Sequence, residues 1–533
     1  MDPMGRRLSC PLLVLPVALL AGGPAFAQTT IHVPDDVPTI QGAIALALPG
    51  DTVLVKPGLY PETLNFLGKA ITVKSEAGPA TTIVDAGQTD SVVTFTSAEG
   101  PGSVLEGLTL RNGNATPGYG DGGGIRIESS SPTILNNVVR DNSACAGAGV
   151  SVGFGSPLIQ GNVIISNRQA GCSGGTGGGG IGLRGAASAQ VIGNVIAGNA
   201  MSSADGGGLA LFAAGTPTIR GNVISGNTTN GNGGGISLGN SSNALIAGNL
   251  IVRNRAFAGG GIAWLVPSGN DGPQVVSNTI ADNQAQQGSG IDADGFDAAT
   301  LLVDNIVVAS PGQVAVFCGN FNDLNPPLFH SNDVFSPSGT AYGGICSDPT
   351  GSDGNISADP MFVDATAFNY RLRKGSAAID AGDDTAPGLP ATDLDGLSRV
   401  VDGDGNGVSN VDMGAFERNP PRCGVDLTFD SGTLNLGLEL YTPEPARWSV
   451  LLAHSDKIAR LWSVTIPAVA PPTSFSVPIR GFPNVGTVGV LSVLQGPTGV
   501  TCVAFDIVDT GGLGASAKEI QLRLERMSSS GLE

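Results

Sequence analysis

Acidic side chains near residue 300 have the types and spacing that sugar chemistry requires. Asp292, Asp294 and Asp297 follow one another closely, and Arg253 lies upstream. Glycoside hydrolysis needs two carboxyl groups, one as the acid and one as the base or nucleophile. Lyase chemistry needs a base that removes the proton α to a uronate carboxylate, often beside a cation. These four residues are therefore the candidate catalytic set.

A second acidic group has the spacing of a cation site. Asp402, Asp404 and Asn406 place oxygen atoms at alternate positions, as the first half of a calcium loop does. The last position of such a loop is Met413 instead of Glu, and Asp412 could supply an oxygen one residue earlier. We predict calcium at Asp402, Asp404, Asn406 and Asp412. The alternative is an acidic, solvated loop that binds no cation.

The charge balance argues against nucleic acid as a partner. The net charge is −19, from 26 basic and 45 acidic residues. Between positions 348 and 417 there are 13 acidic and 4 basic side chains. A phosphate backbone requires a basic surface, so we expect no nucleic-acid binding.

A repeat must position these groups. An Asn-x-x-x-x-Asn block with apolar residues between the two asparagines recurs at a spacing of 25 to 32 residues, and a Gly-rich block precedes most copies. The Asn blocks are 137–142, 162–167, 194–199, 222–227, 249–254 and 278–283, with a seventh that begins at Asn305 and ends at Ser310. Two blocks in fixed phase indicate one structural unit that is copied along the chain.

The repeat favours short parallel strands. Several glycines per copy exclude a helical pair, and β-branched residues favour strands. Stacked coils would be spaced by about 4.8 Å and would form two interior columns. The first column is Ile125, Val150, Ile181, Leu209, Ile236 and Ile262; the second is Val139, Ile164, Ile196, Ile224, Ile251 and Ile280. The asparagines would stack as amide ladders in the turns.

These residues resemble the right-handed parallel β-helix repeats of the pectin-lyase-like superfamily. The segment Thr39–Ile44, the run Gly50–Val55, the stretch Pro57–Tyr60 and Glu62 are similar to the way such proteins begin. The resemblance implies an all-β fold: a right-handed parallel β-helix solenoid of nine or ten coils over residues 50–310. Residues 38–48 are predicted to form a short capping helix with Ile40, Ile44 and Leu48 on one side.

The chain divides into five parts. Residues 1–27 have the charged start, apolar run and Ala-Phe-Ala site of a signal peptide. Residues 28–347 are the β-helix. Residues 348–420 resemble a choice-of-anchor Q module, which we expect to close the helix and which implies display or release outside the cell. Residues 421–511 alternate like a small antiparallel β-sandwich, and 512–533 form a flexible or short helical tail.

Cysteine usage fits export. Six cysteines follow the signal peptide, and stacking of neighbouring turns favours a disulfide between Cys145 and Cys172. Locality suggests Cys318 with Cys346 and Cys423 with Cys502, although six cysteines allow fifteen connectivities. No apolar stretch after the signal is long enough to span a membrane. We predict a secreted or cell-surface protein of unspecified oligomeric state.

Two functions remain open. The phrases Asn-Thr-Asp and Gly-His-Gly of polygalacturonases are absent, no histidine lies in the repeats, and no lysine lies between Lys74 and Lys374. These features favour a non-catalytic protein that contacts an extracellular polysaccharide or a cell-surface component. The alternative is a polysaccharide lyase or glycoside hydrolase. The aromatic residues best placed to stack on sugars are Tyr119, Phe154, Phe212, Phe257 and Trp264.

Overall fold

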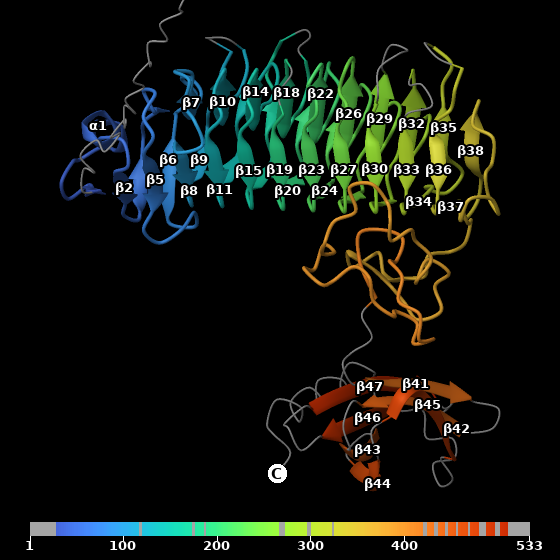
Figure 1. Cartoon of the computed structure of the whole chain (residues 1–533). Helices are drawn as coiled ribbons and strands as arrows, with labels where there is room; N and C mark the ends of the chain where they lie inside the picture. Colours follow the sequence, from blue (N-terminus) through green and yellow to red (C-terminus); the bar gives the residue numbers. More distant parts are fainter. Residues whose placement is uncertain are drawn as a thin grey trace, which may run out of the picture.

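Short strands stacked at the period of the sequence repeat form a long parallel β-solenoid (Figure 1). The computed structural model describes residues 28–116, 120–172, 176–185, 188–265, 272–295, 300–321 and 324–418, and the backbone of strands between 424 and 509. The predicted signal peptide and C-terminal tail lie outside the described residues.

Three parallel sheets run along the solenoid, and each coil contributes one strand to each. Sheet A contains β1 (Thr30–Val33), β2 (Thr52–Val55), β5 (Thr72–Ser75), β8 (Val104–Glu106), β11 (Thr133–Leu135), β15 (Leu158–Gln160), β19 (Gln190–Ile192), β23 (Thr218–Arg220), β27 (Leu245–Ala247), β30 (Gln274–Val276), β33 (Leu301–Val303) and β36 (Leu328–His330). Sheet B contains β3 (Gly58–Tyr60), β6 (Thr82–Asp85), β9 (Thr109–Arg111), β12 (Val138–Arg140), β16 (Val163–Ile165), β20 (Val195–Ala197), β24 (Val223–Ser225), β28 (Leu250–Val252), β31 (Thr279–Ala281), β34 (Ile306–Val308) and β37 (Asp333–Phe335).

Sheet C carries the outward face on which the site is built. Its strands are β4 (Leu64–Asn65), β7 (Val93–Phe95), β10 (Ile125–Glu128), β14 (Val150–Gly153), β18 (Ile181–Arg184), β22 (Leu209–Phe212), β26 (Ile236–Gly239), β29 (Ile262–Leu265), β32 (Ile291–Asp294), β35 (Val314–Cys318) and β38 (Thr340–Gly344). A short fourth sheet contains β13 (Ser143–Ala144), β17 (Arg168–Gln169), β21 (Ala200–Met201) and β25 (Thr228–Thr229). The solenoid continues to β38, beyond the predicted end near residue 310.

The two predicted interior columns are confirmed. Ile125 pairs with Val150, Val150 with Ile181, and the register continues through Leu209 and Ile236 to Ile262. Val139 begins the second column, whose members pair in the same way through Ile280. All of these side chains are fully buried. Alternation along each strand therefore places one apolar stripe of each sheet in the core.

Both asparagine ladders form. Asn222 is typical: its Oδ1 accepts the Asn194 backbone N–H at 2.8 Å, and its Nδ2 donates to Val191 O and to Asn249 Oδ1, each at 2.9 Å. The first ladder also continues past Asn305 through Asn332 to Asn355. Each buried amide thus satisfies turn groups that no strand pairing reaches.

Close approach of neighbouring coils explains the glycine blocks. A Cβ atom on Gly235 would lie 2.6 Å from Gly261 O and 2.8 Å from the Ile251 side chain. Such contacts leave no room for a side chain at this position of the turn.

The N-terminal helix is shorter than predicted. Helix α1 (Ile40–Leu46) begins at the N-cap Thr39, and the Glu62 carboxylate accepts the backbone N–H groups of Ile40 and Gln41 at 2.9 and 2.8 Å. Ile40 and Ile44 are buried as expected. The prediction for Leu48 was wrong: it lies beyond the helix and is 58% exposed, because the chain turns toward β2.

Two of the three suggested disulfides are present. Cys145 bonds to Cys172 with Cα atoms 5.7 Å apart, and Cys318 bonds to Cys346. Each bond joins neighbouring coils. Cys423 with Cys502 lies outside the residues whose side chains are described. Within the described part of the chain, no helix has the length and apolar character that a membrane crossing requires.

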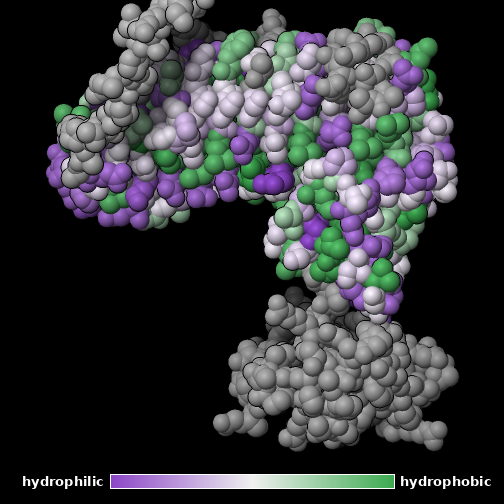
Figure 2. Space-filling view, in the orientation of Figure 1, coloured by the Kyte–Doolittle hydropathy of each residue, from purple (hydrophilic) through white to green (hydrophobic). Residues whose placement is uncertain are grey.

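Residues 348–418 form an irregular module, with β39 (Phe362–Asp364) antiparallel to β40 (Asn369–Leu372), that packs on the flank of the solenoid. Tyr370, Ala415 and Phe416 pack on the outward side chains of β28 and β31. Leu372, Ile379 and Met413 pack on Ile306 of β34, and Ala386 on sheet A. Figure 2 shows this module in continuous contact with the solenoid. We expected this module to close the helix. Its first residues continue the last coil, where Ile356 bridges Asp333 and Asn355 ends the first ladder. The rest lies along the sides of the late coils, where outward apolar residues need cover.

Polar contacts fix the module in place. The Tyr370 hydroxyl donates to Asp282 Oδ2 at 2.6 Å, and the Ala415 N–H donates to Thr279 Oγ1 at 2.9 Å. Inside the module, Arg399 donates to Gly414 O and Asp412 O, each at 3.0 Å. Its Nε lies 3.1 Å from Glu417 Oε1, a charge contact whose N–H is not aligned for a hydrogen bond.

The C-terminal region contains long antiparallel strands in two sheets. One sheet has the order β41 (Gly424–Asp430), β42 (Asn435–Thr442), β45 (Val469–Pro478). The other has the order β44 (Lys457–Ile466), β43 (Ala446–His454), β46 (Thr487–Gln495), β47 (Thr501–Asp509).

Candidate functional site

The outward face of sheet C is the candidate site. Residues with side chains on this face alternate with the core residues of each strand. The first outward position of the middle coils holds small, buried residues, namely Ser151, Gly182, Ala210, Ser237 and Ala263, because the preceding Gly-rich turn packs against it. The second position, which we call the outer row, is open. It holds Glu128, Gly153, Arg184, Phe212, Gly239, Leu265 and Asp294.

A charged cluster occupies the N-terminal end of the outer row. Arg184 Nη2 lies 2.7 Å from Glu128 Oε2 and 3.2 Å from Asp121 Oδ2. Glu128 and Arg184 are two strands apart, and Gly153 lies between them. A Cβ atom on Gly153 would lie 2.6 Å from Glu128 Oε2, so only glycine lets the ion pair form across this coil. Burial raises the pKa of Asp121, and the Arg184 guanidinium opposes that rise.

Two of the predicted catalytic acids lie at the other end of this face. Asp292 and Asp294 both project outward from β32. Desolvation by the surrounding protein, and then the Asp294 carboxylate, raise the pKa of Asp292 to about 7. Asp294 accepts the Phe321 N–H at 2.8 Å and lies over Gly319. The third acid, Asp297, lies outside the described residues.

The structure does not bring Arg253 to these acids. Arg253 follows β28 in sheet B, where its Nη2 donates to Ala365 O and Thr366 O at 2.5 and 2.9 Å and its Nε to Tyr370 Oη at 3.3 Å. Its guanidinium also lies 5.0 Å from the centre of the Phe368 ring. Arg253 therefore attaches the module to the solenoid.

The aromatic residues divide between core and surface. Trp264, predicted as a stacking residue, is 2% exposed, because its register with Leu238 and Ala293 places it in the core. Phe154 and Phe212 are 62% and 44% exposed on the candidate face, Phe257 is exposed on a neighbouring turn, and Tyr119 lies outside the described residues.

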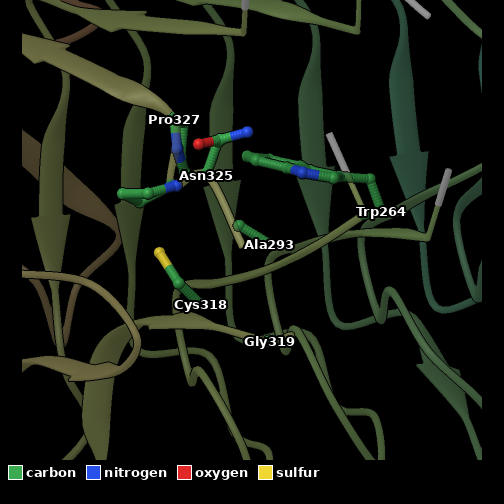
Figure 3. Close-up of a pocket in the computed structure, with 8 residues that line it drawn as sticks. Trp264, Ala293, Cys318, Gly319, Asn325 and Pro327 are labelled. Carbon is green, nitrogen blue, oxygen red and sulfur yellow. The ribbon is translucent and has the colours of Figure 1, made fainter. Parts of the chain in front are cut away.

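The cavity beside Trp264 is too small for a sugar. It lies among Trp264, Ala293, Cys318 and Asn325, with Pro327 on its far side (Figure 3). Its volume of about 10 Å³ has room for roughly one water molecule.

The predicted calcium ligands gather only in part. Carboxylate oxygens of Asp402, Asp404 and Asp380 lie within 4.8 Å of one another. Asp380 was missed because it lies more than 20 residues upstream. Asp412 is fully buried beneath the loop, where its carboxylate accepts the N–H groups of Asp380 and Arg418 at 2.8 and 2.6 Å. Asn406 Oδ1 accepts the Val408 N–H at 2.7 Å.

The three gathered carboxylates are suited to a hard cation. Burial, and then the charges of Asp404 and Asp402, raise the pKa of Asp380. Asp402 Oδ1 accepts two backbone N–H groups, whereas Oδ2 accepts one and keeps a second lone pair that could coordinate an ion.

Sequence reasoning also missed the charged cluster. Glu128 and Arg184 are 56 residues apart, and they meet only because the coil lengths place them in the same row. The available signal was the register itself: counting from the apolar column gives Glu128, Gly153 and Arg184 equivalent positions in successive coils.

One family model supports the fold, and two solved structures show a distant similarity. A family model described as "Right handed beta helix region" matches residues 175–325, which confirms the predicted handedness there. A solved structure of the PL6 family alginate lyase AlyGC matches at 13% identity with a TM-score of 0.29, and a point mutant of that lyase matches at 12% with 0.33. Each alignment covers 76% of this chain and 60% of the lyase, so the chain spans about three-fifths of the lyase's length. No curated protein matches the chain.

Proposed function

We propose that this is an exported β-helix protein that binds a polysaccharide along the outer row without cleaving it. One observation carries the proposal: charged groups and exposed aromatic rings share one open face over consecutive coils. Sugar hydroxyl groups bond to ionised side chains, and sugar rings pack on aromatic faces. The regular spacing of coils, about 4.8 Å, suits a repeating polymer.

The charged groups are held by protein contacts that do not suit turnover. Arg184 contacts both acids of the charged cluster. Arg253 is bound by the module on another sheet. A second candidate function, polysaccharide cleavage, is favoured by one group: the raised pKa of Asp292, about 7, suits a general acid or base beside the ionisable Asp294.

Affinity electrophoresis against a panel of polysaccharides tests the proposal. Wild-type protein should be retarded by at least one of them, with no new reducing ends or unsaturated products. Arg184→Gln should weaken retardation about tenfold, because it breaks the ion pair that orders Glu128. The matched control is Arg140→Gln, which breaks a similar ion pair with Asp141 on sheet B. Turnover that Asp292→Asn abolishes would establish the enzyme instead.

For the module of residues 348–418, we propose display or release at the cell exterior, following its resemblance to choice-of-anchor Q modules. Its close packing on the late coils supports a fixed position on the solenoid. We also retain calcium as its ligand, now with Asp380, Asp402 and Asp404 as the ligand set.

Calcium should raise the melting temperature of the protein. Binding to the native state alone stabilises it by RT ln(1 + [L]/Kd), about 2.7 kcal/mol at one hundred times Kd. Asp404→Ala should remove most of this response. Asp348→Ala is the control, because Asp348 also caps a turn but lies outside the cluster. Thermal melts with calcium and with chelator measure the effect, and equal melting temperatures for wild type in the two conditions would refute calcium binding.

A further inference from the structure

Phe154 has a conformation that stability does not explain. Its φ is 52°, in the left-handed region, and its side chain is 62% exposed. Equivalent turns of the other coils hold Ser129, Gly185, Ala213 and Asn240, all also with positive φ. A bulky aromatic residue is disfavoured at such a φ. A strained residue that buries little points to a function for its side chain.

The Phe154 ring lies flat on the next coil. A Cβ atom on Gly185 would be 2.4 Å from Phe154 Cε1, so the ring covers this glycine. Phe212 ends a strand instead of lying in the turn, and its ring also packs beside a glycine of the next coil, since a Cβ atom on Gly239 would be 3.3 Å from its Cδ2. Glycine in the next coil thus leaves room for each ring, and both side chains stay partly exposed to solvent.

The two rings have a spacing that suits a polymer of sugars. Phe154 follows β14 and Phe212 ends β22, two strands further along the sheet, so their backbones are about 9.6 Å apart along the solenoid axis. This distance is close to the disaccharide repeat of an extended pyranose chain. Arg184 lies on the strand between them and contacts Glu128, two strands earlier in the outer row.

Charge indicates which class of sugar fits. The charged cluster of Asp121, Glu128 and Arg184, together with the charge of nearby Arg126, sums to zero, and the whole chain carries −19. A polyuronate brings one negative charge per sugar and would be repelled by such a molecule. Hydroxyl groups of a neutral sugar can instead bond to both partners of the ion pair.

We propose that Phe154 and Phe212 are the stacking platform for two alternate rings of an uncharged pyranose polysaccharide lying along β14, β18 and β22. The Arg184–Glu128 pair binds hydroxyl groups of the sugar next to the Phe154 ring. This inference rests on the proposed polysaccharide binding and specifies its site and its class of ligand.

Affinity electrophoresis in gels containing hydroxyethylcellulose, glucomannan, polygalacturonate or alginate tests the platform. A neutral polymer should retard the wild type, and Phe154→Gly and Phe212→Ala should each weaken retardation about 3- to 10-fold. Phe257→Ala is the control, because Phe257 is similarly exposed on a different turn. The melting temperature of Phe154→Gly should stay equal or rise by about 1 to 3 °C, because glycine relieves the positive φ.

The outcomes separate the two proposals. If a neutral polymer retards Phe154→Gly and Phe212→Ala as strongly as the wild type, the stacking role of the two rings is wrong but polysaccharide binding stands. Retardation by polyuronates alone would overturn the neutral class. A melting temperature several degrees lower in Phe154→Gly would show that the ring serves packing, which contradicts the inference. No retardation by any polymer would overturn both proposals.

Discussion

Replacing Asn222 by alanine should lower the free energy of unfolding by about 3 to 6 kcal/mol. The substitution leaves the Asn194 backbone N–H, the Asn194 side-chain amide and Val191 O without the partner they have in the ladder. Each buried polar group left without a hydrogen bond costs about 1 to 3 kcal/mol. Asn222 is fully buried, so water cannot replace the lost partner.

Asn230 provides the matched control for this experiment. It is exposed in the same coil and donates one hydrogen bond, to Ser202 O at 3.0 Å. Asn230→Ala should change stability by less than about 0.5 kcal/mol. Urea unfolding followed by circular dichroism measures both variants. A similar loss of unfolding free energy in Asn222→Ala and Asn230→Ala would mean that a ladder asparagine stabilises the protein no more than a surface amide does.

Replacing Asp304 or Asp333 by asparagine should stabilise the protein at pH 8 and change little at pH 4. Both residues are fully buried, and one carboxylate oxygen of each has no hydrogen-bond partner among the described residues. Burial is the main cause that raises the pKa of each to about 7. The Asp383 N–H, which donates to Asp304, and the Ala358 N–H, which donates to Asp333, oppose the rise.

The direction of the pH effect follows from these raised values. The folded state keeps a proton that the unfolded chain releases near pH 4, so the stabilising contribution is complete below pH 4 and is lost as the pH rises toward 7. About three pKa units correspond to at most roughly 4 kcal/mol for each residue. Asparagine cannot ionise and should recover about 1 to 4 kcal/mol at pH 8.

Melting temperatures at pH 4 and pH 8 test this expectation. The gain from Asp304→Asn should be present at pH 8 and nearly absent at pH 4. Asp348→Asn, at an exposed turn, should show no such difference. An equal gain in melting temperature at pH 4 and at pH 8 would mean that the carboxyl group of Asp304 is ionised at both pH values.

The sequence predicted the solenoid well because its folding rules are local and repeated. Ile125 and Asn137 recur in phase with their equivalents, and the stacked coils of a solenoid turn that phase into columns and ladders. Ladder members Asn332 and Asn355 were missed because the glycine blocks that mark the repeat end earlier. Trp264 was misplaced because its position within the coil, not its type, decides its burial.

The site was harder to predict because it depends on side-chain contacts between residues of different coils. Glu128 meets Arg184 only across Gly153, and Asp380 joins Asp402 only after the module has folded. Apolar residues on both faces of β28 and β31 could have indicated that the module covers the late coils. The contacts of Arg253 could not be predicted from the residues near it in sequence, because its partners lie more than 100 residues away.

A crystal structure with a bound oligosaccharide tests the central claim most directly. The oligosaccharide should come from whichever polymer retards the protein most strongly. Our account predicts sugar rings over β14, β18 and β22, with one ring on Phe154, one on Phe212, and hydroxyl groups within hydrogen-bond distance of Arg184 or Glu128. Sugar bound to sheet A or sheet B, or to the module of residues 348–418, with the outer row bare, would contradict the account.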